Sequence, residues 1–191
     1  MRGYFGLGVE GINKPMNVGN LFRSAHAFGA GFVFTVAATY EEKEGGKADT
    51  SAATGQVPFY AFPSVEALLL PKGCALVGVE LTPDAVDLPS FCHPRRAAYV
   101  LGPERGSLSP AMTRRCEFVV RIPATFCVNV GIAGAIVMYD RMIALGRYPA
   151  RPLVPGGKVE PLPDHAYGGP KLRRAMDTFR AAPPKAARDP G

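Results

Sequence analysis

Short apolar runs alternate with segments of helical periodicity over the first 148 residues. Runs that are mainly apolar predict strands buried on both faces of a sheet; they span Tyr4–Val9, Phe32–Ala37, Ala75–Leu81, Ala97–Leu101 and Phe118–Ile122. Apolar residues at helical spacing predict helices over Asn17–Phe28, Pro110–Cys116 and Asn129–Leu145. Ser64 is expected to cap a further short helix that ends at Leu70. Because helices separate the buried strands, the pattern indicates a parallel α/β sheet.

The pattern changes in two places. Residues 41–57 are polar, charged and glycine-containing, which predicts an exposed loop. After Tyr148, prolines recur at short intervals, and proline interrupts both helices and sheet ladders. We therefore expect one domain over residues 1–148 and an extended, Pro-rich basic C-terminal arm over residues 149–191. A short helix over Pro170–Ala181 is compatible with the spacing of its apolar residues, whose face would suit the core or a second copy of the chain.

Charge is distributed unevenly along the chain. Residues 1–140 carry 12 Lys and Arg against 12 Asp and Glu, whereas residues 141–191 carry 10 against 4, so the second part accounts for the whole net charge of +6. This asymmetry indicates a polyanionic partner contacted by the C-terminal part. A solvated basic tail without a partner is the alternative.

Composition excludes several other classes. The four cysteines and three histidines lack the paired spacing of metal or redox sites, so no metal site is expected; they are Cys74, Cys92, Cys116, Cys127, His26, His93 and His165. No apolar run reaches the roughly 18–20 residues of a membrane helix, and the N-terminus has no secretory signal pattern. We therefore expect a cytoplasmic protein without a membrane partner.

Three loop motifs carry candidate chemistry. The first, Asn17-Val-Gly-Asn-Leu-Phe-Arg23, opens a predicted helix. Asn17 can cap that helix, and Arg23, two turns further on, offers a planar fork of donors suited to phosphate. Taken alone, the motif could equally be a capped amphipathic helix with a surface arginine.

The second and third motifs each follow a predicted strand. In Leu101–Leu108, Glu104 stands between Gly102 and Gly106, where ligands of open parallel sheets are expected. In the third motif, Asn129 opens a helix of small apolar residues that can pack closely against a neighbour or a ligand. Alone, the second motif could be a turn and the third an ordinary helix cap.

Together, in order and content, the three motifs resemble the signature motifs of the SpoU (TrmH-type) family of SPOUT methyltransferases, over roughly residues 4–148. The resemblance implies a SPOUT-type parallel sheet flanked by helices with a C-terminal trefoil knot, a rare exception to unthreaded chain connections. It also implies a homodimer that binds S-adenosylmethionine in a bent shape and methylates a ribose 2′-hydroxyl of RNA.

The resemblance assigns roles to individual residues. Asn17 and Arg23 would lie near the ribose and phosphate of the RNA, with Glu104 supporting Arg23 and Asn129. The methyl donor would be held by Leu81, Gly102, Gly106, Ile122, Cys127 and Val128. The family often has serine at the positions of Cys127 and Gly131, so a hydroxyl role at either position is lost here.

The implied chemistry is attack of the 2′-oxygen on a methyl group that the sulfonium charge already activates, so the protein must mainly orient it. Arginine is a poor base, and we expect Arg23 to bind the adjacent phosphate and stabilise the developing alkoxide.

The first predicted strand begins close to Met1, so recognition of the RNA is expected to fall to the catalytic surface, the partner subunit and the arm, with tRNA favoured over rRNA.

Two alternatives remain. One is a catalytically inactive RNA-binding protein of the same fold. The other is a Rossmann-type nucleotide enzyme, suggested by glycines 6, 8 and 11, although Asn-Lys-Pro and not a helix follows them directly.

Overall fold

A computed structural model of the chain describes residues 3–39 and 57–163. The predicted loop, apart from Val57, and the predicted helix Pro170–Ala181 lie outside the described residues. The chain divides into two compact units, Met1–Arg147 and Tyr148–Gly191. None of the described helices combines the length and apolar character that a membrane span requires.

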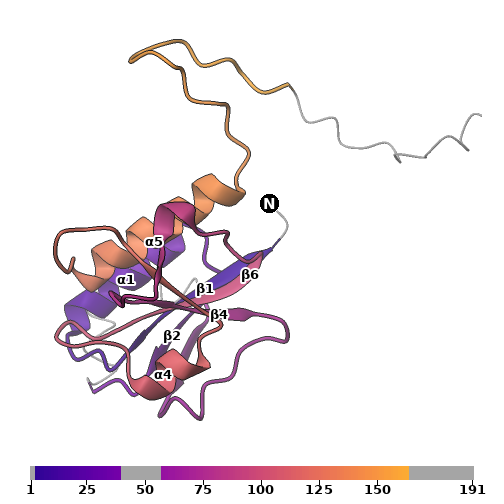
Figure 1. The fold of residues 1–191 in the computed structure, drawn as a ribbon. Coiled ribbons are helices and arrows are strands. Elements are labelled where there is room, and N and C mark those ends of the chain that lie inside the picture. The colour runs from indigo at the N-terminus through magenta and orange to yellow at the C-terminus, as the bar shows by residue number, and fades with distance from the viewer. Residues whose placement is uncertain (1–2, 40–56, 164–191) are drawn as a thin grey trace, which may run out of the picture. The chain divides into compact units, whose positions relative to one another are not determined.

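The first unit is built on one parallel sheet (Figure 1). Its strands are β1 (Tyr4–Glu10), β2 (Phe32–Val36), β3 (Phe59–Phe62), β4 (Ala75–Val79), β5 (Val86–Asp87), β6 (Arg96–Leu101) and β7 (Phe118–Arg121). They are ordered β3-β2-β1-β6-β4-β7-β5, and every neighbouring pair is parallel. The helices are α1 (Pro15–Ala27), α4 (Pro110–Arg115) and α5 (Val130–Leu145), with a short 3-10 helix η1 (Leu88–Ser90). The predicted α/β class and parallel sheet are confirmed, and the knot stays an implication of the resemblance.

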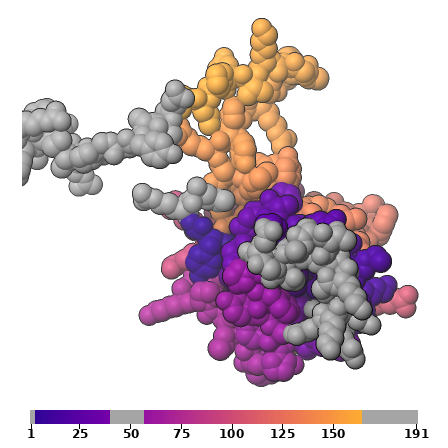
Figure 2. Space-filling view, turned by 180° about the vertical axis from the view of Figure 1, so that it is seen from behind, coloured from indigo at the N-terminus to yellow at the C-terminus, as the bar shows by residue number. Residues whose placement is uncertain are grey.

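Both faces of the sheet are covered by apolar packing. Ala97, Tyr99 and Leu101 of β6 point into a core shared with α1 and α5, whereas Ala98 and Val100 point into a second core that includes α4. The two faces can be followed in Figure 1, and Figure 2 shows the molecule from the opposite side. Burial on both sides explains why the strands are continuous apolar runs and do not alternate.

Helices α1 and α5 lie side by side on one face (Figure 1). A methyl group added at Gly134 of α5 would come within 2.5 Å of Cδ1 of Leu21 in α1, so the missing side chain permits the close approach of the two helices. This contact matters for the site because both helices begin at the carboxyl edge of the sheet.

Gly6 and Gly8 permit close packing inside the sheet. A side chain at Gly6 would come within 2.3 Å of the Phe32 ring, and one at Gly8 within 2.4 Å of the Phe34 ring. Both glycines lie in β1, and the two rings come from the adjacent strand β2. Their role is therefore to admit aromatic rings, which removes the basis for the Rossmann-type interpretation.

Helix α1 begins earlier than its capping pattern suggested. Lys14 occupies the cap position without a side-chain hydrogen bond, and Pro15 is the first helical residue. Proline is favoured at that position because its fixed φ matches the helix and its missing N–H needs no partner. The prediction that Asn17 caps the helix is wrong, and Asn17 lies in the first turn with its amide available for other contacts.

The short helix predicted after Ser64 does not form. Ser64 Oγ accepts a hydrogen bond from Ala67 N at 3.3 Å, but only a single turn follows. The Arg115 guanidinium donates to the carbonyl oxygens of Val65 and Leu68. Within the segment, Leu68 N donates to Val65 O at 3.2 Å, which closes the one turn that forms.

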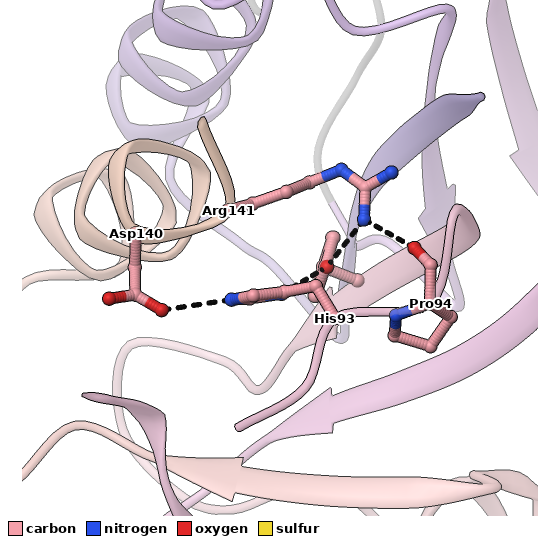
Figure 3. A network of polar contacts seen from close by, with 5 residues as sticks. His93, Pro94, Asp140 and Arg141 are labelled. Atoms are coloured by element: carbon pink, nitrogen blue, oxygen red, sulfur yellow. Dashed lines mark hydrogen bonds and ion pairs between the residues drawn. The ribbon is translucent and has the colours of Figure 1, made fainter. Parts of the chain in front are cut away.

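Arg141 joins α5 to the amino-terminal edge of the sheet (Figure 3). Only 1% of this residue is exposed. Nη1 donates to Pro94 O at 2.6 Å and to the Tyr99 hydroxyl at 3.1 Å, and Nη2 donates to Arg95 O at 2.8 Å. A buried cation is tolerated because oxygen acceptors surround it.

His93 extends this network to the surface of α5 (Figure 3). Its Nε2 lies 2.8 Å from Asp140 Oδ2 and its Nδ1 lies 2.6 Å from the Tyr99 hydroxyl. Burial, together with the neighbouring Arg141 charge, lowers the pKa of His93 below its ordinary value, although Asp140 acts in the opposite direction. The network holds the carboxyl-terminal half of α5, while the opposite end of that helix enters the candidate site.

Candidate active site

A cavity of about 350 Å³ lies at the carboxyl edge of the sheet. Parallel strands β4, β6 and β7 end at this edge, so the segments that follow them converge there. All six residues assigned to the methyl donor line the cavity, namely Leu81, Gly102, Gly106, Ile122, Cys127 and Val128. Its volume falls within the range typical of small-molecule sites.

One chain of hydrogen bonds connects the three motifs. Asn17 Nδ2 donates to Glu104 Oε1 at 2.9 Å, and Asn129 Nδ2 donates to Asn17 Oδ1 at 3.2 Å. Asn129 Oδ1 accepts from Gly131 N at 2.9 Å and so caps α5, as its position predicted. All three side chains line the cavity, which places residues separated by 112 positions in one polar cluster.

Glu104 does not make the expected contact with Arg23. It contacts Asn17 and reaches Asn129 only through that residue, and no hydrogen bond or ion pair joins it to Arg23 within the described chain. The reason is helical phase. Arg23 follows Asn17 by six positions, so at about 100° per residue the two side chains leave α1 about 120° apart.

Arg23 instead lies in a separate groove between α1 and α5. The groove has a volume of about 520 Å³, and Ser24 and Tyr139 also line it. Asn129 lines both the groove and the cavity, so the two hollows meet at the start of α5. Of the four residues assigned to catalysis, three therefore lie in the cavity and Arg23 lies beside it.

The charged groups of the cavity define the ligand it suits. Its lining includes two carboxylates, those of Glu80 and Glu104, and the ammonium group of Lys14. Glu104 Oε2 is buried and has no hydrogen-bond partner within the described residues. An unsatisfied buried acceptor costs about 1–3 kcal/mol, so a ligand that brings a donor or a cationic centre would stabilise the site.

Sequence reasoning missed Glu80 and Lys14. Glu80 follows β4 directly, and Lys14 precedes the first residue of α1. A carboxylate immediately after a buried apolar strand was the available signal for Glu80, because parallel strands direct such residues to the ligand edge. Lys14 carried no comparable signal, since its place depends on where α1 begins.

The two positions that depart from the family's usual serine behave differently. Cys127 is exposed and carries a free thiol in the cavity wall. At Gly131, an added side chain would lie 3.2 Å from Asn129 Oδ1, the oxygen that caps α5. Glycine at this position therefore leaves the cap uncrowded.

Metal chemistry has no evident centre in the described part of the chain. No group of three or more His, Cys, Asp or Glu residues there could hold a metal ion.

Comparison with known proteins places this geometry in a family. The profile of the SpoU rRNA Methylase family matches residues 5–139. The chain is 28% identical over 146 residues to the 23S rRNA (guanosine-2′-O-)-methyltransferase RlmB of Nitrosomonas europaea, covering 69% of this chain and 53% of that protein. It is 28% identical over 144 residues to an uncharacterized tRNA/rRNA methyltransferase of Archaeoglobus fulgidus, covering 72% and 63%.

Solved structures agree on the fold. The AdoMet-bound rRNA methyltransferase from Sinorhizobium meliloti superposes with a TM-score of 0.68 at 19% identity, covering 77% of this chain and 59% of that one. The chain thus spans between about half and two thirds of the length of these relatives. The match over residues 5–139 includes all three motifs, and the chain belongs to the SpoU rRNA methylase family.

Proposed function

We propose that this protein transfers a methyl group from S-adenosylmethionine to a ribose 2′-hydroxyl of RNA. The observation that carries the proposal is the hydrogen-bonded cluster of Glu104, Asn17 and Asn129 in the wall of the cavity, in a chain of this family. The name of the RlmB relative, a guanosine-2′-O-methyltransferase, supports the ribose as the acceptor.

The cavity fits the methyl donor chemically. S-adenosylmethionine carries a sulfonium and an ammonium group, which suit the carboxylate of Glu104, and a carboxylate, which suits Lys14. The unpartnered Glu104 Oε2 can accept a hydrogen bond from the ammonium or from a ribose hydroxyl of the donor. Apolar lining residues such as Val79 and Ile122 offer surface to the adenine ring.

Transfer of the methyl group is a single displacement. The ribose 2′-oxygen forms a bond to the methyl carbon while the carbon–sulfur bond breaks, the electron pair of that bond returns to sulfur, and the hydroxyl proton passes to water. The protein's contribution is to hold the two reactants in line, which can supply much of the rate. In the proposed role, Arg23 binds the phosphate next to the target ribose and stabilises the developing alkoxide.

Two assays test the proposal against an inactive RNA-binding protein of the same fold. We expect saturable binding of S-adenosylmethionine by calorimetry and transfer of its labelled methyl group to bulk RNA. The labelled RNA is then digested to nucleosides. If the labelled nucleosides carry no 2′-O-methyl group, the ribose assignment is contradicted. RNA binding without donor binding would support the inactive alternative.

The RNA is proposed to be tRNA, with rRNA as the second candidate. A solved structure of similar fold is named the TrmH/SpoU tRNA modifying enzyme of A. aeolicus, whereas the RlmB relative is named for 23S rRNA. Mapping of 2′-O-methyl positions in both RNA classes, in cells with and without the gene, decides between them.

We further propose a homodimer formed through the apolar residues of α5 beside the groove, with Arg23 of α1 at the edge of the interface and open to RNA. Apolar side chains are exposed along this face, including Ile132 at 56%, Tyr139 and Ile143. Ile132→Glu should therefore convert the dimer to a monomer in sedimentation analysis, because a buried interface does not accept an unpaired charge. Leu69→Glu is the matched control, since Leu69 is 78% exposed and lies outside this face. A monomeric wild-type protein would overturn the proposal.

The basic arm is proposed to contact RNA phosphates. Neutralising Arg151 and Lys158 together by glutamine should weaken RNA binding and reduce the dependence of log K on log salt by up to about 0.7–0.9 for each lost phosphate contact. Both residues lie in the described part of the arm and are exposed. Binding measured over a salt series checks this. An unchanged salt slope would show that the arm does not contact the phosphates.

A further inference from the structure

Two carboxylates outside the motif cluster hold the loop that carries Glu104. Glu80 follows β4, and its Oε2 accepts a hydrogen bond from Leu108 N at 2.7 Å while its Oε1 accepts from Leu81 N at 2.9 Å. Leu81 lines the cavity. Glu80 therefore ties the segment after β4 to the far end of the loop after β6.

Glu10 provides a second attachment one residue further along. It is the last residue of β1 and only 6% exposed. Its Oε2 accepts from Ser109 N at 2.8 Å, and its Oε1 accepts from Ser109 Oγ at 2.6 Å. Ser109 Oγ in turn accepts from Met112 N and caps α4. A buried carboxylate is costly unless it is hydrogen-bonded, so these contacts fix where the loop turns into the helix.

The sheet order gives this arrangement its symmetry. Strand β6 lies between β1 and β4, so the loop that leaves β6 is held by one carboxylate from the strand on each side. The loop also folds back on itself, because a side chain at Gly102 would lie 3.0 Å from Leu108 N. Both ends of residues 102–109 are thus fixed, and Glu104 stands between them in contact with Asn17.

We propose that Glu10 and Glu80 are positioning residues that set the affinity for the methyl donor by fixing loop 102–109. We call these two residues the carboxylate brace. The inference rests on the proposed function. Both oxygens of each carboxylate are occupied by N–H or O–H groups of the loop and its neighbours, so the brace acts through the loop. Glu10 does not line the cavity, which makes any effect of Glu10 on the donor indirect.

The test replaces each carboxylate by its amide. In Glu80→Gln, the NH2 group that replaces one oxygen faces the backbone N–H of Leu81 or Leu108, and that hydrogen bond is lost. In Glu10→Gln, the negative charge that strengthens both hydrogen bonds from Ser109 is lost. We expect the Kd for S-adenosylmethionine, measured by calorimetry on the full chain, to rise about 10-fold in each variant, because a loop that has lost about 1–3 kcal/mol of attachment occupies the binding-competent conformation only part of the time. In the double variant, the fold increase in Kd should be smaller than the product of the two single-variant increases, because both substitutions release the same loop.

A second readout separates positioning from general stability. The amides of Leu108 and Ser109 should exchange hydrogen faster in the corresponding variant, followed residue by residue with NMR. Glu117→Gln is the control, because Glu117 is exposed and does not line the cavity, and it should leave both donor Kd and exchange unchanged. Loss of unfolding free energy with an unchanged donor Kd would overturn the inference and show a merely structural role.

Glu80→Asp keeps the charge but shortens the reach by one methylene. The brace requires this variant to lose donor affinity as Glu80→Gln does, and a fully retained affinity would show that only the negative charge matters and overturn the role of Glu80. Glu80→Asp also provides the test of Glu80 if Glu80→Gln does not fold. Should the wild-type chain fail to bind S-adenosylmethionine, the proposed function fails, whereas the exchange of Leu108 and Ser109 still reports whether the carboxylates hold the loop.

Discussion

Arg141→Ala should lower the free energy of unfolding by about 2–5 kcal/mol, the range expected when a large buried side chain is truncated and buried acceptors lose their donor. The guanidinium satisfies the carbonyl oxygens of Pro94 and Arg95 and the hydroxyl of Tyr99 in the interior. Alanine leaves these groups without their donor and opens a cavity beside Phe5, whose ring centre lies 5.3 Å from the guanidinium carbon. Urea denaturation followed by circular dichroism measures the loss.

The matched control is Arg114→Ala. Arg114 lies in the last turn of α4 and is exposed, so the same truncation should change the free energy of unfolding by no more than about 0.5 kcal/mol. Equal effects of the two substitutions would mean that the network around Arg141 does not stabilise α5 on the sheet.

The sheet could be predicted wherever burial left a pattern in the sequence. Residues 97–101 are apolar throughout because both of their faces are covered, and this run was identified as a strand. Strands β3 and β5 were missed for physical reasons. Residues Phe59–Phe62 form a half-exposed edge strand with neither alternation nor full burial, and Val86–Asp87 is too short to show any period.

The site was predictable at the level of loops but not of contacts. The residues assigned to the donor line one cavity because parallel strands bring their carboxyl ends to one edge. The partner of Glu104 depended on which residue of α1 faces the cavity, and Asn17 is free to contact Glu104 because it lies inside the first turn and does not cap the helix. Glu10 is the last residue of a strand, so its contact with Ser109, 99 positions away, could not be anticipated locally.

Arg23→Ala should reduce the rate of methyl transfer by about 10²–10³-fold, the cost typical of removing one group that stabilises transition-state charge. The affinity for S-adenosylmethionine should stay within about twofold, because the affected interaction is made to RNA and the transition state. Arg23 is exposed in the groove and does not line the donor cavity. Single-turnover transfer and calorimetric donor binding are measured on the same preparations.

Two further variants make this division of roles decisive. Arg23→Lys keeps the positive charge but loses the planar fork, so it should recover only part of the rate if two-point contact with a phosphate matters. Glu104→Gln should show the opposite pattern, with weakened donor binding, because its Oε2 is the unpartnered acceptor in the cavity. If Arg23→Ala instead weakens donor binding as much as it slows transfer, Arg23 belongs to the donor site. The separation between cavity and groove would then not correspond to a separation between donor and RNA.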